Sequence, residues 1–513
     1  MHLAKRTGCA GGERVRIPVT QTIDREPRKR PPEEHRKGPR APSARERRLT
    51  DGCLLAIGVV SLLLHVLLVP GDWPAGWDES VYLSQVTPGI EGYFFMAWHA
   101  RGITLIVAPV TYLGGSVADV RLFLMVLSAI AVTVTYRLWV PLVGMAAAVA
   151  AFVFSFSWQG FVLASEVKPN YWGALLCLAA TALIARRLEG GRTRDLILAS
   201  VVLAAAALVR PTEATVLTGA IGLFILIWKR TSWRDVIALG IGLLLGWLPW
   251  IIEMSVRFGG LTGALEEARK GQHFVMVPLT ENVLRHLAYT DGKSAASAIP
   301  GAIWWSVLVL MAAAALTRGV KRSDRASALL CSLGALALAA EYLIFVPALA
   351  PRFLLPAYAL ASVPFAIGLV SLLRGSGAFR VLGVVVLLLM IPWMIWQGTV
   401  VTRRIPSTDK APALQTRVGT KIRRLAQDRP CFVLSQPKYP QIAYTAGCSG
   451  EKAGPRLPSD DRLTELARGD RVVFVLRIVE APKRSLLSSV EPMRFGMPGR
   501  KVWFLYELPR PPG

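Results

Sequence analysis

The sequence predicts an all-α polytopic membrane protein of about 11 transmembrane helices that ends in a small extracytoplasmic α/β domain. Of the 513 residues, 53% are hydrophobic and only 18% are charged, and the mean hydropathy is +0.43. Fifteen Trp, 34 Pro and 44 Gly accompany long runs of Ala, Leu, Val and Ile. This mixture is typical of helices that cross lipid and break near its surfaces. A single water-soluble globule is therefore excluded.

Residues 1–50 are predicted to form a disordered basic tail in the cytoplasm. They hold fourteen basic and six acidic residues, a net charge of +8, and are rich in Pro, Gly and Arg. Such a segment has too little apolar surface to fold alone. About fifty polar residues precede the first apolar run, whereas a secretory signal begins with a short basic region. We therefore expect the first helix to remain as an anchor.

The transmembrane domain is expected to occupy residues 51–400. A helix needs about 20 mostly apolar residues to cross the hydrocarbon. The run at 103–113 is too short and is followed by Gly114 and Gly115, so we expect it to lie on the membrane surface. The predicted crossings are 53–70, 120–137, 141–158, 170–186, 196–209, 212–228, 235–252, 301–317, 326–347, 353–373 and 379–397.

Basic residues mark the loops that we assign to the cytoplasm of a multi-pass plasma (inner) membrane protein. Counting 103–113 as a crossing would put these loops outside, against the positive-inside rule. Topology and contact with anionic membrane lipids explain much of the net charge of +25, so no nucleic-acid partner is expected. The residues concerned are Arg137; Arg186, Arg187, Arg192 and Arg194; Lys229, Arg230 and Arg234; Arg318, Lys321, Arg322 and Arg325; and Arg374 and Arg380.

Residues 401–513 are expected to form the extracytoplasmic α/β domain. The runs CFVLS (431–435), RVVFVLR (471–477) and KVWFLYEL (501–508) predict strands, and SDDRLTELARGD (459–470) predicts a helix and a turn. Cys431 and Cys448 lie here, in an oxidising compartment, and are candidates for a disulfide, with two free thiols as the alternative. No CxxC, HExxH, GxSxG or GxxxxGK[ST] string occurs. The sequence therefore gives no support for a zinc ribbon, a zincin, a serine hydrolase or a P-loop protein.

Ionisable residues gather at the predicted outer face, and charged groups beside lipid most often belong to an ion pair, a pore or an active site. Asp78 and Glu79 follow the first crossing, and Glu166 lies at the outer mouth of the third and fourth. Arg352 and Arg210 lie at outer helix ends, where a guanidinium suits a lipid phosphate. The alternatives are a solvated acidic turn for the Asp-Glu pair, snorkelling for Arg352 and a local salt bridge to Glu213 for Arg210.

Taken together, these segments resemble the GT-C superfamily of membrane glycosyltransferases, nearest to its protein mannosyltransferase-like and aminoarabinose transferase-like enzymes. The resemblance spans roughly residues 50–400 and depends on the order of the segments rather than on one diagnostic string. A proline-rich KPPL-like string before the interfacial helix is missing, which speaks against a lipid A-type acceptor. The segments are GWDESVYL (76–83), HARGITLIVAPVTYLGG (99–115), RLFLMVLSAIAVTVTY (121–136), SEVKPNYWGALLCLAATALI (165–184), LVRPTEATVL (208–217) and PRFLLPAYAL (351–360).

The resemblance implies transfer of a sugar from a polyprenyl-phosphate donor to an extracytoplasmic acceptor, with inversion and without a nucleotide cofactor. Asp78 matches the catalytic acidic position and would act as general base. Glu79 would orient the loop or help hold a divalent metal ion, and Glu166 would bind that metal or the acceptor. Arg352, with Arg210, would bind the donor phosphate.

Four further residues are assigned to substrate binding in this interpretation. His99 and Arg101 precede the interfacial helix where relatives carry polar substrate contacts, with interfacial anchoring as the alternative. Tyr82 and Lys168 lie beside the two acidic motifs. A transporter or flippase, or a non-catalytic partner in envelope polysaccharide assembly, is the alternative function. A non-catalytic partner would need no functional carboxylate at Asp78. A transporter would be expected to carry ionisable residues and helix breaks near mid-membrane and an internal repeat.

Overall fold

The computed structural model describes residues 43–508 except 72, 229–232, 273–277, 289–294, 318, 346–349, 406–411, 428, 455–458, 469–470, 483–484 and 497–501. The basic tail up to residue 42 lies outside the described residues, as do Lys229, Arg230 and Arg318 of the predicted cytoplasmic loops.

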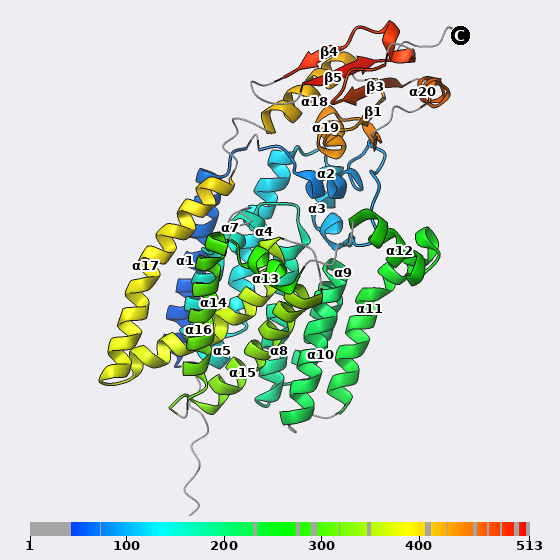
Figure 1. The fold of residues 1–513 in the computed structure, drawn as a ribbon. Coiled ribbons are helices and arrows are strands. Elements are labelled where there is room, and N and C mark those ends of the chain that lie inside the picture. Colours follow the sequence, from blue (N-terminus) through cyan, green and yellow to red (C-terminus); the bar gives the residue numbers. More distant parts are fainter. Residues whose placement is uncertain are drawn as a thin grey trace, which may run out of the picture. The chain divides into compact units, whose positions relative to one another are not determined.

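The fold class predicted from the sequence is confirmed, because long apolar helices are followed by a small sheet (Figure 1). Among the described residues, eight helices are long and apolar enough to cross a membrane, or nine if one bent pair counts as a span. The helices that precede the C-terminal domain are α1 (Ala44–Leu68), α2 (Trp77–Ser84), α3 (Gly102–Tyr112), α4 (Val117–Arg137), α5 (Val140–Val143), α6 (Ala146–Ser155), α7 (Trp158–Ala164), α8 (Pro169–Leu188), α9 (Thr193–Val209), α10 (Pro211–Trp228), α11 (Trp233–Phe258), α12 (Leu261–Gln272), α13 (Leu279–Leu287), α14 (Ala295–Ala315), α15 (Arg322–Ala340), η1 (Glu341–Phe345), η2 (Pro351–Leu354), α16 (Leu355–Arg374) and α17 (Ala378–Arg404).

Eight of the eleven predicted crossings coincide with helices that are long and apolar enough to span a membrane. Those at 196–209 and 212–228 coincide with α9 and α10, which are not among these eight, and one prediction was wrong. The run at 141–158 was expected to be one span, but it is broken into α5, α6 and α7, and α7 is bent by 70° from α6. Gly144 has a φ of +55° between α5 and α6, and the Ser157 hydroxyl caps α7 by accepting from the Gly160 N–H at 3.1 Å. A capped new start favours a turn over a continued helix. The bend sets the course of residues 165–168, which help to build the site described below.

The helix α3 matches the predicted interfacial segment. Its 11 residues span only about 17 Å, well short of the roughly 30 Å of hydrocarbon in a bilayer. It packs against α2, α4, α8 and α9 and closes the loop between α1 and α4, which is predicted to lie outside and is called the first outer loop below.

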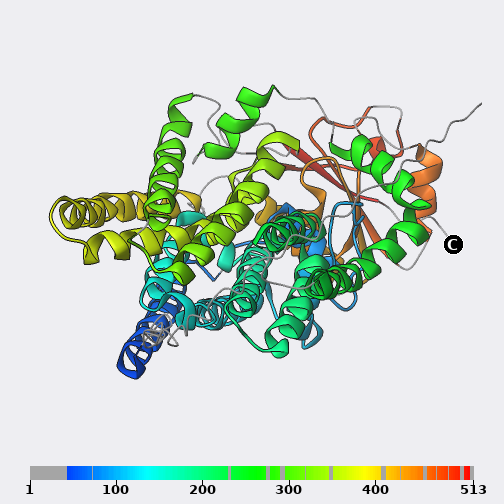
Figure 2. The ribbon, with the colours of Figure 1, turned by 90° about the horizontal axis from the view of Figure 1, so that it is seen from below.

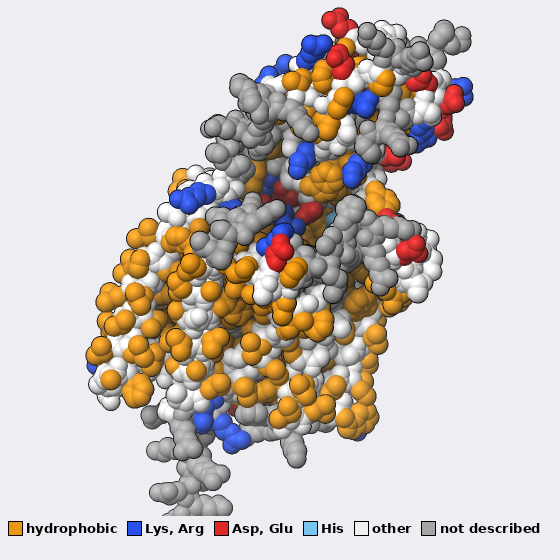
Figure 3. Space-filling model, viewed as in Figure 1, with side chains coloured by type: hydrophobic (Ala, Val, Ile, Leu, Met, Phe, Trp, Pro, Cys, Tyr) orange, Lys and Arg blue, Asp and Glu red, His pale blue; other side chains and the backbone are white. Residues whose placement is uncertain are grey.

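The centre of the helical part consists of α8 and α16, which are buried over 83% and 89% of their apolar windows. The corresponding values for α1 and α17 are 22% and 6%, and Figures 1 and 2 show both helices at the edge of the bundle. Both helices expose Leu, Ile and Val side chains, and Figure 3 shows the hydrophobic surface on the side of α17. Lipid is the solvent that makes such exposure favourable.

Close helix contact depends on small residues where α9 meets α11. A Cβ atom on Gly242 would come within 2.3 Å of the Ser200 carbonyl oxygen, and one on Gly246 within 2.2 Å of that of Ala204. The two backbones therefore touch, as small residues allow between membrane helices.

Ion pairs join the predicted cytoplasmic loops to one another at one end of the bundle. Arg186 contacts Asp195 at 3.3 Å and Arg187 contacts Asp235 at 3.4 Å, which links the ends of α8, α9 and α11. Arg374 after α16 contacts Glu46 at the start of α1 at 3.4 Å. These loops share a face, as the predicted topology requires.

The C-terminal domain has a five-stranded sheet in the order β2-β1-β3-β5-β4. The three predicted strands are confirmed, as is the helix predicted within 459–470, which is Asp460–Ala467, whereas residues 469–470 lie outside the described residues. The strands β2 and β4 were not predicted, because four and three residues of mixed polarity carry no strand period. In the described part, β1 pairs in parallel with β2 and β3, and β5 is antiparallel to β3 and β4. A disulfide joins Cys431 in β1 to Cys448 beside β2. The elements are α18 (Pro412–Ala426), β1 (Cys431–Ser435), α19 (Tyr439–Ala446), β2 (Ser449–Lys452), α20 (Asp460–Ala467), β3 (Val472–Arg477), η3 (Leu486–Ser489), β4 (Met493–Phe495) and β5 (Trp503–Glu507).

The orientation predicts which loops react with a membrane-impermeant thiol reagent in intact cells. In a background without unpaired cysteines, Leu279→Cys, in an exposed position of α13, should be labelled because its loop is assigned to the outside. Thr193→Cys, exposed at the start of α9, should be labelled only after the cells are permeabilised. The reverse labelling pattern would overturn the topology and the site with it.

Candidate active site

The first feature of the site is an ion pair between side chains 274 residues apart in the sequence. Asp78 lies in the first turn of α2, where the Glu79 carboxylate accepts the Gly76 N–H at 2.7 Å. Arg352 lies in η2, which Pro351 begins at the outer end of α16. Its Nη2 atom is 3.3 Å from Asp78 Oδ2, and the two side chains are 33% and 32% exposed. A ligand can therefore reach both charged groups.

A second guanidinium lies beside the same aromatic ring as Arg352. The Cζ atoms of Arg352 and Arg210 are 5.0 and 5.5 Å from the centroid of the Phe353 ring, and Tyr342 stacks on that ring at 5.1 Å. Arg210 donates from Nε to Glu213 at 2.9 Å and from Nη2 to the Tyr342 hydroxyl, which in turn donates to Glu213 at 2.7 Å. The local salt bridge to Glu213 is thus present, and it fixes Arg210 near Arg352.

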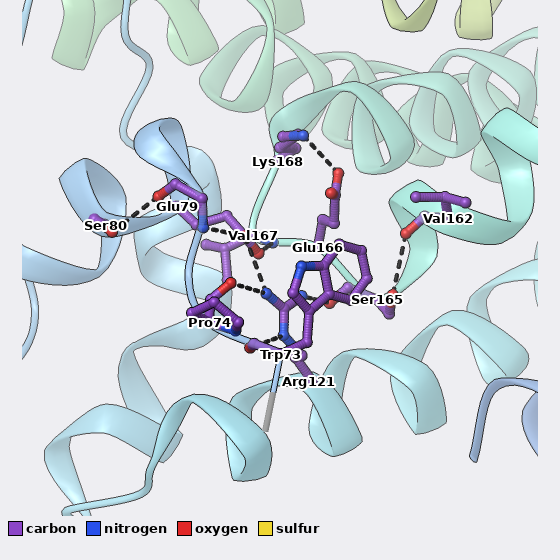
Figure 4. A network of polar contacts seen from close by, with 11 residues as sticks. Trp73, Pro74, Glu79, Ser80, Arg121, Val162, Ser165, Glu166, Val167 and Lys168 are labelled. Carbon is purple, nitrogen blue, oxygen red and sulfur yellow. Dashed lines mark hydrogen bonds and ion pairs between the residues drawn. The ribbon is translucent and has the colours of Figure 1, made fainter. Parts of the chain in front are cut away.

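The buried residue Arg121 of α4 ties three segments of the outer face together (Figure 4). Its guanidinium donates to the carbonyls of Trp73, Pro74 and Ser165 at 3.1–3.2 Å and to Glu79 Oε2 at 3.1 Å. It also lies 4.4 Å over the Trp73 ring. Sequence analysis did not single out Arg121, although a charged residue inside a long apolar run is a signal for a buried partner.

Both carboxylate oxygens of Glu79 accept hydrogen bonds within this network, so Glu79 does not face a ligand. Its second oxygen, Oε1, accepts the Val167 N–H at 2.9 Å, and the residue is 2% exposed. Burial alone would raise the pKa of Glu79, but the charges of Arg121 and Lys168 and the N–H groups of Gly76 and Val167 offset it and hold the pKa below its usual value. Glu79 therefore orients the loop that carries Asp78.

Glu166 and Lys168 form an ion pair at 2.6 Å next to this network, with side chains 9% and 18% exposed. Glu166 is thus already paired with a cation. Over the described residues, no group of three or more His, Cys, Asp or Glu side chains is placed to hold a metal ion. In the described part of the chain, Glu79 and Glu166 are both engaged by cations, Arg121 and Lys168. This pairing does not fit the divalent metal that the resemblance implied, and we assign no step to one.

His99 and Tyr82 lie against each other, with ring centroids 5.1 Å apart, and both interact electrostatically with Asp78. His99 is 7% exposed, and its Nδ1 atom is buried without a hydrogen-bond partner among the described residues. Burial lowers the pKa of His99 to about 4, with Arg210 acting in the same direction and Asp78 opposing. Burial, with Asp78, raises the pKa of Tyr82. At neutral pH both rings are therefore uncharged groups next to Asp78.

Arg101 has a structural partner that the sequence did not reveal. Its Nε and Nη2 atoms donate to the two oxygens of Glu253 in α11 at 2.9 and 2.7 Å, and Nη1 donates to Gln85 at 3.2 Å. This bidentate pair fixes the first outer loop to α11. We therefore assign Arg101 a structural role rather than the substrate contact expected from the resemblance.

The neutral state of His99 predicts how stability depends on pH. The unfolded chain protonates this histidine near its ordinary pKa of about 6.5, whereas the folded chain does so near 4. The contribution of neutral His99 to the free energy of unfolding, up to about 3 kcal/mol, is therefore fully present above pH 6.5 and is lost as the pH falls towards 4. Thermal unfolding in detergent should show a smaller loss of stability between pH 7.5 and 5 for His99→Gln than for the wild type. Identical slopes would show that His99 is not buried and neutral.

The sequence and the fold were compared with those of known proteins. The model of the dolichyl-phosphate-mannose-protein mannosyltransferase family matches residues 94–252. The structure of ArnT from Cupriavidus metallidurans bound to undecaprenyl phosphate covers 89% of this chain and 97% of its own, with 14% identity and a TM-score of 0.58. The chain has the GT-C fold.

Two further solved structures share the GT-C fold with this chain. The apo state of the same ArnT has a TM-score of 0.57, 14% identity and the same coverage of 89% and 97%. The apo oligosaccharyltransferase of Archaeoglobus fulgidus has a TM-score of 0.51 and 12% identity, and the alignment covers 83% of this chain and 69% of that one. No curated protein matches the sequence.

Proposed function

We propose that this protein is a plasma-membrane glycosyltransferase that moves a sugar from a polyprenyl-phosphate donor to an extracytoplasmic acceptor. The observation that carries the proposal is the contact of Asp78 with Arg352 at 3.3 Å, both accessible, in a chain with the GT-C fold. Undecaprenyl phosphate is bound to ArnT, which shares this fold. That ligand supports the same class of donor here.

The donor phosphate is assigned to the two arginines that flank Phe353. A guanidinium offers paired N–H donors to phosphate oxygens and stays charged beside lipid. Arg352 is one-third exposed and binds directly, while Arg210, which is 16% exposed and held by Glu213, adds positive charge. Both stabilise the charge that grows on the phosphate as the sugar departs.

Asp78 is assigned as the general base of an inverting transfer. The acceptor hydroxyl oxygen bonds to the anomeric carbon, the bond from that carbon to the phosphate oxygen breaks, and the hydroxyl proton passes to the Asp78 carboxylate. Base and leaving group must lie on opposite sides of the anomeric carbon. The bound donor therefore lies between Asp78 and Arg352. Its phosphate replaces the Asp78 carboxylate as the ion-pair partner of the Arg352 guanidinium.

The neighbouring side chains are assigned to positioning and substrate binding. Glu79 holds α2 through Arg121, and Lys168 is held by Glu166 beside the same loop. Tyr82 and His99 are neutral at pH 7 and can donate or accept a hydrogen bond without competing with Asp78 for charge. These two residues are our candidates for contacts to the sugar.

The phosphate role of Arg352 predicts a selective loss of donor binding. Arg352→Ala should weaken binding of undecaprenyl phosphate by about 10–100-fold, since a charge-assisted hydrogen bond contributes about 1.5–3 kcal/mol. Arg374→Ala is the control, because Arg374 is an exposed arginine at the opposite end of α16 that pairs with Glu46, and it should leave donor binding unchanged. Binding is measured by microcalorimetry in detergent. Equal affinities of the wild type and Arg352→Ala would exclude the phosphate role.

A further inference from the structure

A cavity of about 640 Å³ lies between the first outer loop and the C-terminal domain. This volume falls within the range of about 300–1,000 Å³ that is usual for small-molecule sites. Trp77 and Phe94 line it from the loop, and Phe432 and Tyr439 line it from the domain. Figure 3 shows acidic and basic side chains gathered where the two parts meet.

The two walls of the cavity are fixed to each other. The Tyr93 hydroxyl donates to the carbonyl of Cys448 at 2.9 Å, and the Glu91 N–H donates to the Ser449 hydroxyl at 3.1 Å. The disulfide from Cys448 to Cys431 then ties this point to the central part of the sheet. The cavity is therefore held open by specific contacts.

The charges that line the cavity balance. Three carboxylates and three cations share the wall, so a ligand with a high charge of either sign would meet as many like charges as opposite ones. A neutral ligand with many hydroxyl groups suits such a wall, because hydroxyls donate to carboxylates and accept from guanidinium and ammonium groups. The charged residues are Glu91, Glu451, Glu465, Lys452, Arg462 and Arg471.

Aromatic rings supply the other half of the wall. Phe94 is 50% exposed, so its ring is accessible to a ligand in the cavity. Trp77 lies edge-to-face with Tyr439, with centroids 5.6 Å apart. A sugar presents apolar C–H faces and polar edges, and these rings together with the charged groups match both.

The cavity lies next to the helix that carries the proposed base. Trp77, in its wall, is the residue before Asp78, so their Cα atoms are about 3.8 Å apart. Successive side chains of a helix point about 100° apart, and Asp78 is directed at Arg352. The cavity thus adjoins the base without including it, since its described lining holds Trp77 but not Asp78.

We infer that this cavity binds the acceptor and that the acceptor is a neutral glycan. The inference rests on the transferase function proposed above and names its substrate class. A protein acceptor would instead pair with β2, the edge strand of the described sheet, which contributes Gly450, Glu451 and Lys452 to the wall.

The test measures binding, not turnover, on the full-length protein in detergent. The probes are short neutral oligosaccharides of glucose, mannose, galactose and arabinose, and an unstructured Ser/Thr-rich peptide. Phe94→Ala and Glu451→Gln are compared with Val479→Ala and Glu480→Gln. The controls match in exposure, at 60% for Val479 against 50% for Phe94 and 55% for the Glu480 side chain against 57% for Glu451. Both glutamates pair with an arginine, and the described lining of the cavity includes neither control residue.

At least one oligosaccharide should bind the wild type, and each cavity variant should weaken that binding about tenfold, equivalent to about 1.4 kcal/mol. The two controls should bind it as the wild type does. Failure of every oligosaccharide to bind, equal binding by all variants, or preference for the peptide overturns the inference. Oligosaccharide binding with this variant pattern, but no sugar transfer from any polyprenyl-phosphate donor, would refute the proposed function and leave the glycan site standing.

Discussion

Asp78→Asn is expected to leave the protein inserted and folded but to lower sugar transfer by about 10²–10⁴-fold, the usual contribution of a general base. The amide keeps the shape of the carboxylate and can still accept a hydrogen bond from Arg352, so α2 stays in place. It cannot take the acceptor proton. Turnover is measured with membranes, a polyprenyl-phosphate sugar and the envelope acceptor.

The matched control for this variant is Asp461→Asn, an exposed aspartate in the first turn of α20. It should transfer sugar at the wild-type rate. Wild-type turnover by Asp78→Asn would exclude Asp78 as the base and would favour the transporter or the non-catalytic partner, since neither requires this carboxylate.

The second large effect is expected at the buried pair of Arg121 and Glu79, whose side chains are 2% and 3% exposed. Arg121→Leu leaves the Glu79 carboxylate buried without its ion partner and three backbone carbonyls without a donor. Breaking such a pair costs about 3–5 kcal/mol. A clear drop in unfolding temperature in detergent is the expected result.

Arg137→Leu is the control on the same helix, because its pair with Asp51 is 68% and 36% exposed and should contribute less than about 1 kcal/mol. The double variant Glu79→Leu/Arg121→Leu should be less destabilised than the sum of the single changes, since no buried charge is left unpaired. In Arg121→Lys, kcat should decrease more than the affinity for the donor. The lysine cannot make all the hydrogen bonds of the guanidinium, so the loop that carries Asp78 shifts, whereas Arg352 keeps its position. Equal effects of Arg121→Leu and Arg137→Leu on unfolding would refute this positioning role.

Most of the helical fold could be predicted from hydropathy and charge, and the exception has a local cause. The bilayer fixes the length of a crossing and the positive-inside rule fixes its direction, which suffices for α1, α4 and α17. The bend between α6 and α7 depends on a serine cap, and the break between α5 and α6 depends on a glycine with positive φ. Window hydropathy resolves neither.

The site was only partly predictable, because its chemistry depends on long-range pairs. Composition and order singled out Asp78, Arg352 and Arg210. The structure places Asp78 against Arg352 and both arginines beside Phe353. The partners of Glu79 and Arg101 lie 42 and 152 residues away, beyond any local pattern. Of the two adjacent carboxylates, Asp78 is accessible, whereas Glu79 is buried and structural. Only tertiary packing determines which of them takes which role.

The most direct test of the account is the structure of Asp78→Asn in complex with a polyprenyl-phosphate sugar. The account predicts the donor phosphate within hydrogen-bond distance of Arg352, with Arg210 nearby, and the anomeric carbon between that phosphate and residue 78. A phosphate bound elsewhere, or a sugar turned away from residue 78, would contradict it.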